Sequence, residues 1–109
     1  MVDAAAKRKA LSYIGFAARS RAIAVGTEAV ISEIRKCSPG TVAVVLATDA
    51  SERTKKQIND KCTSHGAPVA AVPLTKDEIA GAAGKKTSVS AVAVTNRDLV
   101  RALTSLGSE

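Results

Sequence analysis

Aromatic residues are nearly absent from this sequence. Its 109 residues include one Phe, one Tyr and no Trp, although 46% of them are hydrophobic. RNA-binding sheets of the open type stack successive bases on several aromatic rings, so the composition excludes a platform of that kind. The apolar content and the length fit one small domain, residues 1–109, with a single core.

Cysteine and histidine are scarce as well. The two cysteines, Cys37 and Cys62, show no CxxC spacing, and His65 is the one histidine. A disulfide framework or a four-ligand zinc site therefore has no support in the sequence. Cys62 and His65 lie close together on a predicted helix, but a nucleophile pair needs a third group to orient the base. We expect reduced thiols, no metal and no cofactor.

The remaining residues form no catalytic constellation. Adjacent Asp77 and Glu78 point about 100° apart on a helix, so they are not a carboxylate pair for acid and base catalysis.

Residues 81–87 (GAAGKKT) superficially suggest a phosphate loop. However, Ile79 stands where that motif needs glycine, and Lys86 stands where it needs Ser or Thr. The GxxG spacing of this segment is also that of a KH domain, whose order of elements differs. We expect a protein without enzymatic activity.

The sequence also has no long apolar run, and it has fewer acidic than basic residues. No run approaches the roughly 20 apolar residues that span a bilayer, and we expect neither a membrane segment nor a signal peptide. Lys and Arg number 16 against 10 Asp and Glu, which gives a net charge of +6. This balance favours a partner that carries phosphates, and the reduced cysteines favour a cytoplasmic location. The clustered basic residues are Lys7, Arg8, Lys9, Arg19, Arg21, Lys85 and Lys86.

Hydrophobic periodicity predicts helices that alternate with short strands. Apolar residues recur at helical spacing in some segments and form continuous or β-branched runs in others. The expected order is helix 4–19, strand 22–25, helix 27–36, strand 41–47, helix 51–65, strand 69–72, helix 75 to about 84, strand 89–94 and a final helix from 95 to about 106. Such alternation predicts an α/β fold, with helices on both faces of a mainly parallel or mixed four-stranded sheet.

Capping residues mark several of these boundaries. Thr75 and Glu78 have the spacing of a capping box, which predicts the start of a helix. Thr95 with Asp98 predicts the start of the last helix in the same way. Gly66 is suited to end the helix before it, since glycine adopts the left-handed conformation that a helix end often needs.

Five short segments stand out together. They are residues 15–19 (GFAAR), 26–30 (GTEAV), 42–51 (VAVVLATDAS), 84–86 (GKK) and 91–95 (AVAVT). In sequence and order they resemble the kink-turn RNA-binding superfamily of ribosomal proteins, the L7Ae, L30e and S12e group, and within it the small bacterial YlxQ-like members. The resemblance implies a three-layer α/β/α sandwich with a four-stranded mixed sheet. It also implies that a sharply bent RNA is held at two places.

The two places are the start of the second helix and the loop before the last strand. The residues that match the first place are Gly26, Thr27, Glu28, Ala29 and Ser32, and those that match the second are Lys85, Lys86, Thr87, Ser88 and Val89. On this resemblance we also expect Arg19 and Arg21 to lie near the edge of the surface.

The chain departs from the family pattern at three of these positions. Kink-turn binders of the family generally have Asn or Lys at the position of Glu28, Glu or Gln at that of Ala29, and Lys at that of Ser32. Those polar groups read the G·A pairs of the bend, so the resemblance implies weaker recognition of a standard kink turn here. The last loop also reads Lys-Lys-Thr-Ser, where strong binders have an apolar-acidic-apolar pattern.

Two functions from different classes remain open at this point. The first is a non-enzymatic, monomeric RNA-binding protein that binds structured, kink-turn-like RNA and is associated with the ribosome or the translation machinery. The second is a protein–protein interaction module on the same scaffold, because one fold hosts many functions. Phosphate contacts make binding fall steeply with salt, and this dependence separates the two.

Overall fold

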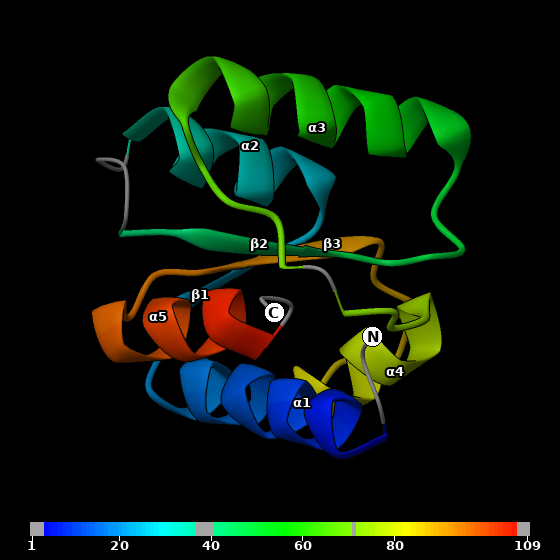
Figure 1. Ribbon diagram of the computed structural model, residues 1–109. Coiled ribbons are helices and arrows are strands. Elements are labelled where there is room, and N and C mark those ends of the chain that lie inside the picture. Colours follow the sequence, from blue (N-terminus) through cyan, green and yellow to red (C-terminus); the bar gives the residue numbers. More distant parts are fainter. Residues whose placement is uncertain (1–3, 37–40, 71, 107–109) are drawn as a thin grey trace.

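The computed structural model describes residues 4–36, 41–70 and 72–106. The elements in these residues are α1 (Ala4–Arg19), β1 (Ile23–Val25), α2 (Thr27–Lys36), β2 (Ala43–Leu46), α3 (Glu52–His65), α4 (Lys76–Ala82), β3 (Ala91–Val94) and α5 (Arg97–Leu106) (Figure 1). All five predicted helices are present, and three of the four predicted strands are present in shortened form.

The last strand in the sequence lies in the middle of the sheet. The order is β1-β3-β2, and β3 runs antiparallel to both neighbours. Val92 pairs with Val25 of β1 on one side and with Val45 of β2 on the other. Strands β1 and β2 are therefore parallel to each other but not adjacent, because β3 occupies the position between them.

In the described residues the sheet has three strands, so the predicted four-stranded mixed sheet is not confirmed. Residues 69–72, expected as a strand, make one parallel bridge, between Val44 and Val69. The Val44 N–H donates to the Pro68 carbonyl at 3.0 Å, and the Ala70 N–H donates to the Val44 carbonyl at 2.8 Å. Further along, the carbonyl of Leu74 accepts a hydrogen bond from the Thr48 N–H, two residues after β2, at 2.9 Å. The sheet of the described residues is three-stranded and antiparallel.

Two layers of helices enclose the sheet. In β3, Val92 and Val94 belong to one buried cluster, whereas Ala91 and Ala93 belong to the other. Successive strand residues point to opposite faces, so the two clusters are the two faces of one sheet. Helices α1, α4 and α5 cover the first face, and α2 and α3 cover the second (Figure 1). Among the described helices, none is both long and apolar enough to cross a membrane.

Side-chain caps set the ends of several helices. The Thr75 hydroxyl accepts a hydrogen bond from the Glu78 N–H, and the Glu78 carboxylate accepts one from the Thr75 N–H, so the predicted capping box is confirmed. Gly66 ends α3 in the left-handed conformation, as expected. The start of α5 differs from the prediction. The Asn96 side chain, one residue after Thr95, accepts from the N–H groups of Asp98 and Leu99.

Candidate nucleic-acid interface

A glycine connects β1 to α2. Gly26 has a φ of 100°, a conformation that side chains rarely adopt. Its carbonyl accepts the first hydrogen bond of the helix, from the Val30 N–H at 2.9 Å. Glycine has no side chain to cap the helix, and in the described part of the chain no side chain bonds the N–H groups of residues 27–29. This end of α2 therefore offers free donors and the positive end of the helix dipole.

The segment between α4 and β3 is held at both ends by backbone hydrogen bonds. The Lys85 N–H donates to the Ala80 carbonyl at 2.9 Å, and the Val89 N–H donates to the Lys76 carbonyl at 3.2 Å. Gly84, with a φ of 73°, makes the turn out of the helix. Between these anchors lie four exposed residues, Lys85, Lys86, Thr87 and Ser88. The segment thus presents two cations and two hydroxyl groups to solvent.

These two features meet at one end of the sheet. The Gly26 N–H donates to the carbonyl of Ala91 at 3.0 Å, and Ala91 is the first residue of β3. The start of α2 and the segment after α4 therefore lie side by side, at the right-hand end of the sheet in Figure 1. We call this surface, residues 26–28 with residues 84–88, the α2–loop surface.

Two further residues expected at the start of α2 lie along the helix. Ala29 is half-buried, and Ser32 is exposed. Glu28 and Ser32 share a shallow groove of about 400 Å³ between α2 and α3, which Ile31, Arg35, Lys36 and Gln57 complete. Glu28 is exposed and adds a negative charge where α2 begins.

Val89 differs from the other residues expected in the loop. Its side chain is buried in the core cluster that α1, α4 and α5 cover, and its N–H is bonded to Lys76. Neither group is free to contact a ligand. Val89 anchors the segment instead.

The two arginines do not border the α2–loop surface together. Arg21 precedes β1, which runs away from it towards Gly26, and the three residues of that strand span about 10 Å. Ile23 pairs with Val94, so Arg21 lies near the end of β3, whereas Gly26 lies near its beginning. Arg21 and Gly26 are therefore separated by the length of β1.

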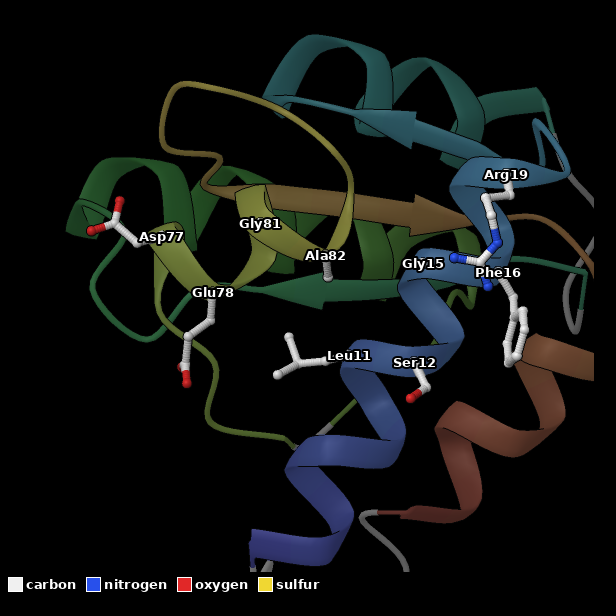
Figure 2. A pocket seen from close by; sticks show the side chains of 9 residues that line it. All are labelled: Leu11, Ser12, Gly15, Phe16, Arg19, Asp77, Glu78, Gly81 and Ala82. Atoms are coloured by element: carbon white, nitrogen blue, oxygen red, sulfur yellow. The ribbon is translucent and has the colours of Figure 1, made fainter.

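Arg19 lies in a different place, in a groove between α1 and α4. Figure 2 shows the side chains around this groove, which has a volume of about 520 Å³. Its lining residues are Leu11, Ser12, Gly15, Phe16 and Arg19 of α1 with Asp77, Glu78, Gly81 and Ala82 of α4. The groove thus connects Arg19 to the end of α4, a few residues before Lys85.

Phe16 is absent from the residues predicted for the site, although half of its surface, 52%, is exposed. The sequence carries a signal for this exposure. The residues of α1 that are buried are Ala10, Ile14 and Ala17, and Phe16 is two positions from Ile14 on the helix. Two positions correspond to about 200° of helical rotation, so the ring points away from the buried stripe.

The acidic end of the groove has a structural role. The carboxylate of Glu78 completes the capping box of α4 and forms an ion pair with Lys7, with the Lys7 Nζ at 3.0 Å. The backbone hydrogen bond from Thr75, followed by the contact with Lys7, holds the pKa of Glu78 below its usual range. Glu78 therefore stays ionised and bound within the protein.

The remaining candidate groups do not converge on a site. Cys62 is buried, and burial raises the pKa of its thiol, whereas His65 is exposed at the end of α3. Cys37 lies outside the described residues. Within the described ranges no three His, Cys, Asp or Glu side chains are placed to hold a metal ion.

An α/β sandwich with a basic loop beside a glycine-led helix start is the architecture that the family resemblance implies. Residues 8–103 match the model of the ribosomal protein L7Ae/L30e/S12e/Gadd45 family. The chain belongs to this family, and the resemblance seen in the sequence is confirmed.

Individual relatives agree with this assignment. The RNA-binding protein YlxQ of Bacillus subtilis is 34% identical over 93 residues, which cover 85% of this chain and 89% of the relative. The RNA-binding protein YlxQ of Enterococcus faecium is 37% identical over 62 residues, or 57% of this chain. That alignment spans 58% of the Enterococcus protein.

Two solved structures are similar to this fold. A protein with unknown function from Bacillus halodurans has a TM-score of 0.80 and 34% sequence identity, with coverage of 93% of this chain and 98% of that one. The 15.5 kD RNA binding protein of Giardia lamblia has a TM-score of 0.73 at 14% identity, with coverage of 97% and 93%. At that identity the Giardia protein shows the fold alone.

Proposed function

We propose that this protein binds structured RNA through the α2–loop surface. One observation supports this most: the hydrogen bond from the Gly26 N–H to Ala91 brings a helix N-terminus beside a loop with two exposed lysines. Both features suit phosphate, since the helix end offers N–H donors and a positive dipole and the lysines offer positive charge. The names of the YlxQ relatives support the same function.

The two parts of the surface have different tasks in this proposal. Lys85 and Lys86 contact phosphates and fix the position of the RNA without reading its sequence. Gly26 lets the backbone approach the RNA closely, because no Cβ stands between them. Thr87 and Ser88 add hydroxyl groups that donate to phosphate or 2′-hydroxyl oxygens.

The RNA that fits this surface best is a sharply bent one of the kink-turn class. Glu28 repels phosphate at the start of α2, so affinity for a standard kink turn is lower than the family pattern would give. The protein acts as a monomer, without catalysis, on an RNA of the ribosome or the translation machinery. These finer points rest on the family resemblance together with the basic loop.

Titration of a labelled kink-turn hairpin and an unbent duplex of equal length tests the proposal. Exchanging Lys85 and Lys86 for Ala should weaken binding to both RNAs and flatten the salt dependence by up to about two units of the log–log slope. The matched control is Lys55→Ala with Lys56→Ala, which removes the same charge from α3, where both lysines form ion pairs within the helix.

Three outcomes would count against the proposal. If the control pair weakens binding as much as the loop pair, binding depends on total charge and not on this surface. If the loop pair has no effect, the surface is wrong. If the unaltered protein binds neither RNA, the function is wrong and the interaction module replaces it.

A further inference from the structure

Phe16 presents an aromatic ring to solvent near the end of α1. Among the described residues it is the one large hydrophobic side chain that is mainly exposed. The ring lies between two grooves. One is the α1–α4 groove of about 520 Å³, and the other, of about 450 Å³, separates the end of α1 from the start of α5. The ring is therefore reachable from two sides.

A cation accompanies the ring. The guanidinium carbon of Arg19 lies 4.8 Å from the centre of the Phe16 ring, the geometry of a cation–π contact. Figure 2 shows the arginine side chain turned back along the helix towards Phe16. The guanidinium also lies beside Gly15, where a Cβ would be in van der Waals contact with the Nη1 of Arg19 at 3.5 Å. The pair thus offers a π-face and a positive charge together.

The groove extends from this pair to the last residues of α4, which precede the loop of the α2–loop surface. A Cβ on Gly15 would lie 3.6 Å from the carbonyl oxygen of Ala82, so the two helices approach closely there. The Lys85 N–H is bonded to Ala80, and the two lysines therefore leave α4 at the same end. The acidic side chains of the groove, Asp77 and Glu78, belong to the first turn of α4.

We propose that Phe16 and Arg19 bind one unpaired nucleotide of the RNA, a proposal that rests on the proposed function. The base stacks on the Phe16 ring, and the guanidinium of Arg19 binds the adjoining phosphate. The strand then continues past Gly15 and Ala82 towards Lys85. Stacking is tolerant of sequence because every base has a π-face. A single ring holds a single base, which agrees with a sequence too poor in aromatics for a stacking platform.

Charge and area favour a nucleotide over a protein partner. Large exposed apolar patches of several hundred Å² mark many protein-binding sites, whereas here the one large hydrophobic side chain that is mainly exposed among the described residues lies beside a cation. Around the ring, Gly15 and Ala82 add little apolar surface, and Leu11 and Leu99 are half-buried. A nucleotide supplies what the pair lacks, a flat π-system and a negative charge.

The absence of tryptophan makes a direct test possible. Phe16→Trp introduces the one tryptophan of the chain, and a base stacked on the indole quenches its fluorescence. The probes are the kink-turn hairpin and the same hairpin with a short unpaired pyrimidine extension. We expect quenching by the extended hairpin and none by the blunt one.

Affinity measurements with the same two RNAs complete the test. The unpaired extension should raise the affinity of the unaltered protein for the hairpin, and we call this increase the gain. Phe16→Leu keeps apolar surface but removes the π-face, so the gain should fall by about five-fold or more, while the affinity for the blunt hairpin is unchanged. Phe16→Tyr should keep the gain. Arg19→Ala should reduce it, whereas the control Arg101→Ala, on exposed α5 surface, should leave it intact.

The outcomes separate this inference from the proposed function. If Phe16→Leu keeps the full gain and no quenching is seen, stacking is wrong, and an apolar docking role for a protein segment would account for the exposed ring. Dependence on Lys85 and Lys86 would then still support RNA binding. If the unaltered protein binds neither hairpin, both proposals are wrong.

Discussion

The backbone N–H of Val89 donates a hydrogen bond to the carbonyl oxygen of Lys76 at 3.2 Å, which returns the chain to the start of the helix it has just left. Residues 84–88 therefore form an arch whose far anchor is Val89 and whose near anchor is the bond from Lys85 to Ala80. Both anchors are made by backbone groups. The side chains of Lys85 and Lys86 take no part in these anchors; both are exposed and can contact a ligand.

The charges at the start of α2 give the first prediction. Exchanging Glu28 for Asn and Ala29 for Glu restores the pattern of the kink-turn binders and leaves the net charge unchanged. The ratio of the affinities for a kink-turn hairpin and an unbent duplex should rise, while the salt dependence stays constant. The stability of the double variant should fall only slightly, because the Glu introduced at position 29 keeps a negative charge in the first turn of α2. An unchanged affinity ratio would show that these positions do not read the RNA.

The conformation of Gly26 gives the second prediction. A Cβ at this position meets no atom within 4 Å, so the cost of Gly26→Ala comes from its φ of 100° alone. The variant should lose about 1 to 2 kcal/mol in the free energy of unfolding, measured with urea. Gly81→Ala is the matched control. It also meets no atom within 4 Å but lies inside α4, where alanine should stabilise the helix by about 0.5 to 1 kcal/mol.

Glu78 gives a prediction about pH. Its pKa is lowered in the folded protein, first by the hydrogen bond from the Thr75 backbone and then by Lys7. A group with a lowered folded pKa contributes stability that is present above its ordinary value of 4.5 and is lost as the pH falls through the folded pKa. Glu78→Gln keeps the capping geometry but cannot titrate.

The measurement compares the two proteins at neutral and acidic pH. The unaltered protein should be more stable than Glu78→Gln at pH 7, and the difference should shrink as the pH falls below 4.5. A difference that is the same at both pH values would mean that the ion pair and the cap do not depend on the charge of Glu78.

Local signals account for what the sequence predicted well. The capping box of Thr75 and Glu78 and the left-handed Gly66 each depend on residues within one turn of a helix, so both could be identified without knowing the fold. The predicted position of the α5 cap was wrong by one residue, because Asn96 and not Thr95 caps the helix. Thr95 and Asn96 are both capping residues, and the Thr95 N–H still donates to the Ala22 carbonyl across the sheet at 2.9 Å, so the helix begins one residue later.

Pairing between distant segments accounts for what could not be predicted. Residues 69–72 are as apolar as a strand, but whether they pair along β2 depends on contacts with a segment distant in the sequence and not on their composition. The same holds for the direction of the sheet. Alternating helices and strands predict a mainly parallel or mixed sheet, whereas β3 lies between β1 and β2 and runs antiparallel to both.

In the candidate site, too, some features follow from local sequence and others depend on how distant segments are arranged. The family motifs located the start of α2 and the loop, and the bond between Gly26 and Ala91 joins them. The positions of Arg19 and Arg21 depend on which end of β1 faces the loop, which no motif encodes. Phe16 could have been found from its place opposite Ile14 on α1, because a large apolar side chain outside a buried stripe is exposed.

Mapping backbone amide shifts by NMR during titration with a kink-turn hairpin tests the central claim most directly. We expect the largest changes at the amides of residues 26–28 and 84–88, with little change along the outer face of α3. Changes centred on α3, or spread evenly over the surface without a focus at Gly26 and Lys85, would contradict the account.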